Sequence, residues 1–178
     1  MIFKHLLNDK EQITIKTSKM KYWILSTLAL INISVVSGQS EEYAAWLLQQ
    51  NIPREFANLL DEEFEKKYKV SDYINPFYLT ADFDGDEVAD IAIAITENET
   101  GKSGFVVIHK STGDYFVIGA GNEMGNGGDD FSWMNIWGTY TKIGDEFIST
   151  GILVGKAESG GGIIYWTGTE YKWKQHGD

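Results

Sequence analysis

The sequence lacks cysteine altogether and contains only two prolines and three histidines. Without cysteine the chain cannot form disulfide bonds, thiolate zinc sites or iron–sulfur clusters, and it cannot carry a cysteine-linked lipid anchor. After residue 38 the only histidines are His109 and His176. Neither has a neighbouring ligand at metal-binding spacing, so we interpret both as ordinary surface or strand-end residues.

Basic residues are scarce as well. The chain has 15 Lys and Arg against 26 Asp and Glu, a net charge of −11. Residues 1–38 hold five of these lysines and two of the acids, which leaves 10 basic and 24 acidic residues and a net charge of −14 for the rest. Such a surface repels phosphates, so it excludes nucleic-acid binding and favours cations or a basic protein partner.

One apolar run stands near the start of the chain. It extends from Tyr22 to Val36, follows Lys19 and Lys21, and ends at small residues before Gln39. This order predicts a signal peptide over residues 20–38, with residues 1–19 as an upstream extension and translation starting at Met20. A membrane span needs about 20 apolar residues, so membrane contact is expected only through an uncleaved N-terminal segment. The protein is predicted to be secreted or periplasmic.

The remaining chain changes texture near residue 70. Residues 39–70 are rich in helix formers, and Phe56, Leu59, Leu60, Phe64 and Tyr68 form an amphipathic stripe typical of a buried helix face. From residue 71 to 178, short β-branched and aromatic segments alternate with Gly, Asp and Asn clusters. We therefore predict an α+β fold in one domain, with N-terminal amphipathic helices packed on an antiparallel β-meander sheet.

The segment "DFDGDEVAD" is the strongest candidate site. Its carboxylates lie at positions 1, 3, 5 and 9, on Asp82, Asp84, Asp86 and Asp90. Gly85 allows a sharp bend between them, and the carbonyl of Val88 adds a further oxygen. Calcium takes six to eight oxygen ligands in a flexible geometry, so the spacing predicts a Ca²⁺ site with a structural role. The alternative is a hairpin turn at Asp84-Gly85 surrounded by solvated acids.

This segment, followed by "IAIAI", resembles the calcium loop of FG-GAP repeats, which occur in integrin α-subunit propellers and in many secreted bacterial proteins. The resemblance implies side-chain ligands at Asp82, Asp84, Asp86 and Asp90 and a backbone ligand at Val88. An EF-hand is excluded because Glu87 and Ile93 occupy the positions where it needs Gly and Glu. FG-GAP propellers carry several copies, whereas this chain has one, covering about 16 of 178 residues. The resemblance therefore implies a metal loop and not a propeller or its ligand-binding roles.

A second unusual stretch is "GAGNEMGNGGDDFSW", residues 119–133. It matches neither the dinucleotide nor the phosphate-loop pattern, so we interpret it either as a functional loop or as a connector. Its acids Glu123, Asp129 and Asp130 could serve a hydrolase acting on polysaccharide or peptide. Aromatic residues gather toward the C-terminus, and we expect them to lie in the core or, if exposed, to form a carbohydrate- or protein-binding face. They are Trp133, Trp137, Tyr140, Tyr165, Trp166, Tyr171 and Trp173. The leading prediction is a non-catalytic, calcium-binding interaction module; the hydrolase is the alternative.

Overall fold

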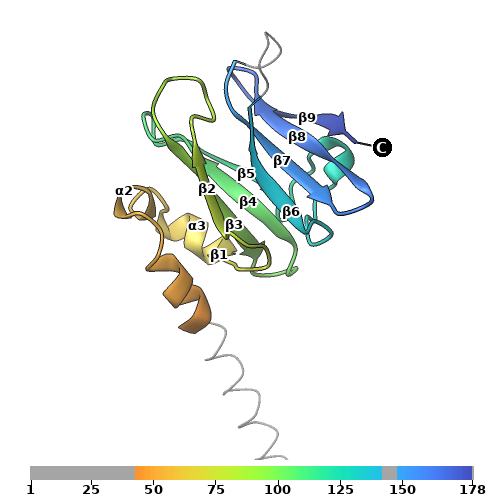
Figure 1. Ribbon diagram of the computed structural model, residues 1–178. Coiled ribbons are helices and arrows are strands. Elements are labelled where there is room, and N and C mark those ends of the chain that lie inside the picture. The colour runs from red at the N-terminus through yellow and green to blue at the C-terminus, as the bar shows by residue number, and fades with distance from the viewer. Residues whose placement is uncertain (1–42, 142–147, 178) are drawn as a thin grey trace, which may run out of the picture. The chain divides into compact units, whose positions relative to one another are not determined.

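The computed structural model describes residues 43–141 and 148–177. The chain divides into two compact units, Met1–Ala44 and Ala45–Asp178, and every strand belongs to the second unit (Figure 1). The predicted signal peptide over residues 20–38 and the upstream extension over residues 1–19 lie outside the described residues. In the part of the chain that is described, no helix is both long enough and apolar enough to cross a bilayer.

The helical segment is shorter and more broken than its periodicity predicts. Residues 43–49 are helical, followed by α2, Arg54–Ala57, and α3, Glu62–Lys67. Asp61 is the N-cap of α3, because its carboxylate accepts a 2.8 Å hydrogen bond from the Phe64 N–H. Tyr68, predicted to be helical, instead starts the first strand.

The first sheet contains β1, Tyr68–Val70; β2, Tyr78–Ala81; β3, Asp90–Glu97; β4, Ser103–Ile108; and β5, Tyr115–Gly119. All its pairs are antiparallel, and β3, β4 and β5 follow one another as a meander. Both β1 and β2 pair with the same edge of β3. The near-continuous apolar sequence of β3 and β4 is explained by burial of both of their faces.

The second sheet contains β6, Ile136–Tyr140; β7, Gly151–Lys156; β8, Gly160–Trp166; and β9, Tyr171–His176. These strands also pair antiparallel, in the order of the sequence. The predicted antiparallel meander is thus divided between two sheets, where a single sheet was predicted. The sequence did not distinguish these cases, because the glycine-rich connection at residues 120–135 has the same composition as the turns within each sheet.

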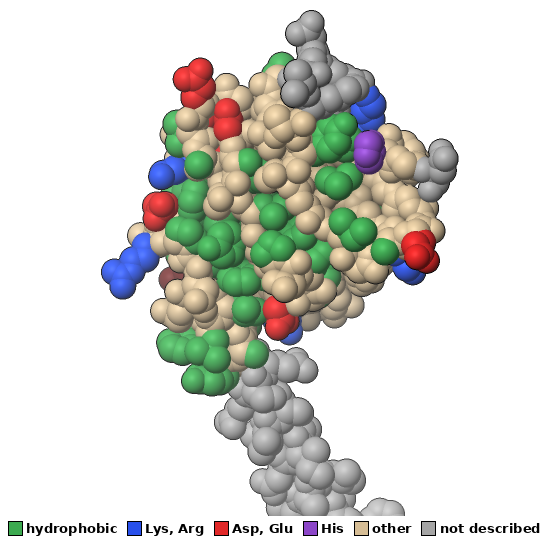
Figure 2. Space-filling view, in the orientation of Figure 1, with side chains coloured by type: hydrophobic (Ala, Val, Ile, Leu, Met, Phe, Trp, Pro, Cys, Tyr) green, Lys and Arg blue, Asp and Glu red, His purple; other side chains and the backbone are tan. Residues whose placement is uncertain are grey.

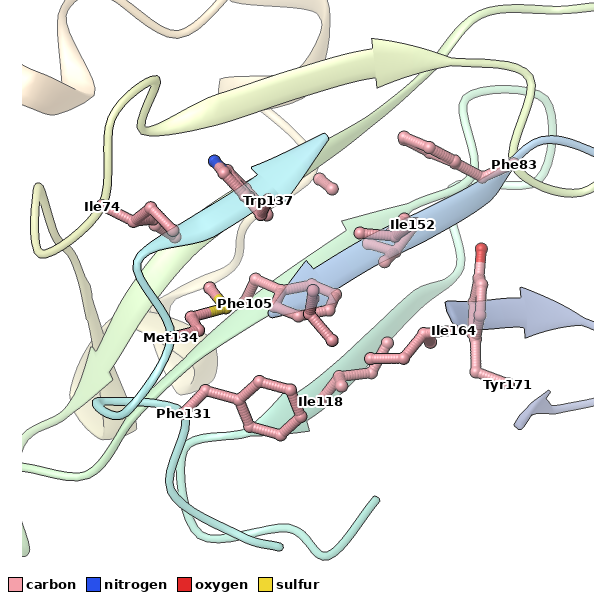
Figure 3. Close-up of a cluster of buried hydrophobic side chains, with 14 residues drawn as sticks. Ile74, Phe83, Phe105, Ile118, Phe131, Met134, Trp137, Ile152, Ile164 and Tyr171 are labelled. Atoms are coloured by element: carbon pink, nitrogen blue, oxygen red, sulfur yellow. The ribbon is translucent and has the colours of Figure 1, made fainter. Parts of the chain in front are cut away.

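The two sheets share a hydrophobic core (Figure 3). Phe105 and Ile118 of the first sheet pack there with Trp137, Ile152 and Ile164 of the second. A second cluster on the other face of β3 and β4 joins strand residues to the helical segment, through Ile52, Phe56, Leu60, Phe64, Ile91, Ile93, Ile95, Val106 and Ile108. The strands β3 and β4 therefore contribute buried side chains to two hydrophobic clusters, one on each of their faces.

Candidate functional site

The loop Asp82–Asp90 connects β2 to β3 and is anchored at both ends. Ala81 and Asp90 are partners in the β2–β3 register, so the loop closes a hairpin. Phe83 is fully buried, and its ring enters the core shared by the two sheets (Figure 3). The carbonyl of Asp82 accepts a 3.0 Å hydrogen bond from the Thr150 N–H, and that of Phe83 accepts one of 2.8 Å from Ser149 Oγ. The loop is thus fixed to both sheets.

Backbone N–H groups hold the Asp82 carboxylate in place. Its Oδ1 accepts hydrogen bonds from the N–H groups of Gly85 at 2.6 Å and Asp86 at 3.2 Å, and its Oδ2 accepts one from Glu87 at 3.1 Å. The turn requires left-handed backbone at Gly85, with φ of 88°, and at Glu87, with φ of 70°. Glu87, the sixth residue of the loop counted from Asp82, therefore has a left-handed backbone conformation, which glycine adopts most easily.

The predicted ligand residues form two groups that share Asp84. Carboxylate oxygens of Asp82, Asp84 and Asp86 lie within 4.8 Å of one another. Asp84 and Asp90 form the second group with His109, again within 4.8 Å. Val88 donates its N–H to Asp86 Oδ1 at 2.8 Å and has an exposed side chain. The four aspartates predicted from spacing are thus brought together around Asp84, and one histidine joins them.

Asp90 is a buried carboxylate that the backbone satisfies. Its exposed fraction is 0%, and it accepts 2.9 Å hydrogen bonds from the N–H groups of Phe83 and Lys110. Burial raises the pKa of Asp90 above its ordinary value, although these two hydrogen bonds oppose the shift. Asp90 thereby connects the loop to the end of β4, and a nearby cation would favour its charged form.

Asp84 and Asp86 have opposite pKa shifts. Burial raises the pKa of Asp84, and the neighbouring carboxylates of Asp86 and Asp82 add to the shift. Hydrogen bonds from Ser111 and from the Val88 N–H lower the pKa of Asp86. Burial thus disfavours the charged form of Asp84, whereas hydrogen bonds favour the charged form of Asp86. A cation bound between these oxygens would remove the repulsion.

His109 was interpreted from the sequence as a surface or strand-end residue, and the surface interpretation is wrong. It directly follows β4, is 3% exposed, and its Nε2 lies 2.7 Å from the Tyr171 hydroxyl oxygen. Its Nδ1 lies 3.4 Å from Asp84 Oδ2, and its ring packs against Phe116 and Trp166. The only local signal was its position at the end of an apolar strand. His176, by contrast, ends β9 and is exposed.

The acids of the glycine-rich stretch are engaged in local structure. Asp129 pairs with Lys102 at 2.5 Å. Asp130 accepts 3.0 Å hydrogen bonds from the N–H groups of Ser103 and Ser132. Glu123 is exposed. Among the described residues, none of these three acids lines the hollow bordered by Trp133 and Trp173.

The C-terminal aromatics are divided between the core and its margin. Trp137 and Tyr171 are buried in the core shared by the sheets, and Trp133, Trp166 and Trp173 pack against it while half-buried.

Comparison with known proteins finds no matching family model, no matching curated protein and no matching solved structure.

Proposed function

We propose that the protein is a secreted or periplasmic, non-catalytic interaction module that binds Ca²⁺ in the loop Asp82–Asp90. One observation carries the proposal: carboxylate oxygens of Asp82, Asp84 and Asp86 lie within 4.8 Å of one another in a loop whose own N–H groups orient Asp82. Carboxylate oxygens at Asp82, Asp84 and Asp86 suit calcium better than magnesium, because calcium accepts a flexible coordination geometry whereas magnesium needs a near-octahedral one. The resemblance to an FG-GAP calcium loop supports the same ion.

The proposed role of the ion is structural. The loop is tied to the second sheet through Thr150 and Ser149 and to the core through Phe83. A cation that binds the folded loop stabilises the fold by mass action, by about 2.7 kcal/mol at a free concentration of one hundred times Kd. Because the loop contacts both sheets, this stabilisation is expected to reach the whole of the second unit.

Calorimetric melting of the full chain tests the proposal, with calcium, with magnesium and with a chelator. Calcium is expected to raise Tm, and the rise is expected to be lost in Asp86→Ala and in Asp84→Ala, each of which removes both carboxylate oxygens of a ligand. Asp114→Ala is the matched control, because Asp114 is an exposed aspartate between β4 and β5, outside the loop. Equal melting with calcium and chelator, or a calcium shift that both loop variants keep, would show that the loop is an acidic turn.

A basic protein is the partner that the charge supports best, since the chain carries a net charge of −11. The face drawn in Figure 2 carries hydrophobic side chains across its middle, with charged side chains mostly toward its margins. This distribution supports a contact surface with an apolar centre and a charged rim. Binding to defined basic and acidic proteins at low and high salt would test the charge preference; equal binding to both would contradict it.

The alternative hydrolase function has no specific support. Asp129 and Asp130, two of its three proposed acids, are held by Lys102 and by backbone N–H groups.

The proposed secretion rests on the predicted signal peptide over residues 20–38. The cover of the first sheet by the N-terminal helices is supported by Phe56 and Phe64, whereas Tyr43, Trp46 and Leu47 are exposed.

A further inference from the structure

A hollow of about 360 Å³ lies where the turn η1, Gly125–Gly127, packs against β8 and β9. Its lining includes two tryptophans, two side-chain amides and glycine backbone, from Trp133, Trp173, Asn126, Gln175, Gly127 and Gly161. The volume falls within the range of about 300–1,000 Å³ usual for small-molecule sites. The hollow brings together Gly127 and Gly128 of the glycine-rich stretch at residues 119–133 with Gly160 and Gly161 of β8.

The glycines are needed because the Trp173 ring lies against their backbone. A Cβ added to Gly162 would lie 2.2 Å from Cζ2 of Trp173, and one added to Gly127 would lie 2.9 Å from its Cζ3. A Cβ on Gly125 would meet Trp173 Cβ at 2.6 Å. These positions exclude any side chain larger than hydrogen, so three glycines from two segments are matched to one indole. Trp173 is thereby held as a rigid platform at the end of the shared core.

The polar groups around this platform are uncharged, and hydrogen bonds hold them in place. Gln175 Oε1 accepts hydrogen bonds from Asn126 Nδ2 at 3.2 Å and from Trp173 Nε1 at 3.3 Å. Trp133 Nε1 donates to the Gly127 carbonyl at 3.0 Å. Both indole N–H groups are thus used inside the protein, while the Asn126 carbonyl oxygen and the Gln175 NH₂ group are on exposed side chains. They offer one acceptor and one donor group beside the aromatic surface.

The lining selects the chemistry of the ligand. No residue among those that line the hollow in the described chain is charged, so the hollow offers no charged partner to a phosphate, a carboxylate or a metal cation. Half-buried tryptophans offer apolar ring surface, and the amides offer hydrogen bonds to hydroxyl groups. A sugar ring has this combination, with C–H faces that stack on an indole and hydroxyl groups at its edge. We propose that the hollow formed by Trp133, Trp173, Asn126 and Gln175 binds an uncharged saccharide.

The hollow and the loop Asp82–Asp90 are separate sites, because no aspartate of the loop lines the hollow. The test uses the full chain with calcium and, in parallel, in chelator at a temperature at which circular dichroism shows the chain to be folded, so that failure of the calcium site and failure of the saccharide site are separable. The probes are cellohexaose, maltohexaose and chitohexaose, with a heparin hexasaccharide as the anionic comparison. Titration calorimetry and tryptophan fluorescence are the two readouts.

At least one neutral oligosaccharide is expected to bind saturably and to change the tryptophan emission. Gln175→Leu alters an exposed amide and is expected to weaken binding about tenfold, as expected for loss of a hydrogen-bonding group. Trp133→Ala is expected to abolish binding. Trp46→Ala is the matched control, because Trp46 is 51% exposed and does not line the hollow, and it is expected to leave the affinity unchanged.

Three results would overturn the proposal. The first is that none of the neutral probes binds. The second is that the anionic hexasaccharide binds more tightly than all of them. The third is that Gln175→Leu and Trp133→Ala, shown by circular dichroism to be folded, bind as tightly as the unmodified chain. Trp133→Phe keeps an aromatic ring and is expected to retain part of the affinity, which separates loss of stacking from loss of fold.

Discussion

Glu87 has a φ of 70°, in the left-handed region that costs most residues about 1–2 kcal/mol and glycine very little. Its side chain is exposed. We therefore expect Glu87→Gly to raise the free energy of unfolding by about 0.5–1 kcal/mol, measured by urea denaturation. Glu99 is an exposed turn residue without positive φ, so Glu99→Gly should have the opposite sign. A loss of stability in Glu87→Gly would contradict the conformational argument.

Asp130 gives a pH dependence with a definite sign. Burial acts to raise its pKa, but hydrogen bonds from Ser103 and Ser132 and the charge of Lys102 outweigh burial and hold the pKa below the ordinary value. An acid with a lowered folded pKa stabilises the fold above its unfolded pKa, and this contribution is lost as pH falls through the folded pKa. The difference in Tm between the unmodified chain and Asp130→Asn should become smaller as the pH is lowered from about 6 to about 3. A difference that grows on acidification would contradict this assignment.

At the scale of elements, Gly162 shows how one missing side chain shapes β8. A Cβ at this position would lie 2.2 Å from Trp173, so either the ring or the strand must move. Gly162→Ala is expected to lower the free energy of unfolding by about 1–3 kcal/mol, measured by urea denaturation. Gly138 in β6 has nothing within 4 Å of its added Cβ and is the matched control. Equal stability of the two alanine variants would show that Trp173 does not lie against Gly162.

Local patterning predicted most elements and not their assembly. The strands β2 to β9 lie within residues 71–178, where short apolar segments and turn residues predicted β structure, because those signals are local. β1 was missed because Tyr68 continues the helical stripe, and its extended state comes from pairing with Glu97. Likewise, spacing predicted the grouping of Asp82, Asp84 and Asp86. It could not predict that His109 joins Asp84, since that contact depends on how β4 lies beside β3.

At the scale of the whole molecule, the shared core predicts that the two sheets unfold together. Phe105 in β4 lies 5.8 Å from Phe131 and 5.6 Å from Trp137 in β6, measured between ring centroids. Phe105→Ala is therefore expected to cost about 3–5 kcal/mol. Tryptophan fluorescence, which reports mainly the second sheet, and far-ultraviolet circular dichroism should shift to the same lower midpoint. Separate midpoints would show that the sheets are independent.

The pairing at the outer edge of β3 also affects how the molecule behaves in concentrated solution. β1 pairs with one end of this edge and β2 with the other, and between them the Ala94 N–H donates to the Phe77 carbonyl while the Ala94 carbonyl accepts from the Ser71 N–H. The strand that carries the segment "IAIAI" therefore has no open row of backbone groups there. Fibril growth starts from such open rows. Two short strands thus protect the segment "IAIAI" from forming cross-β aggregates while the native state persists.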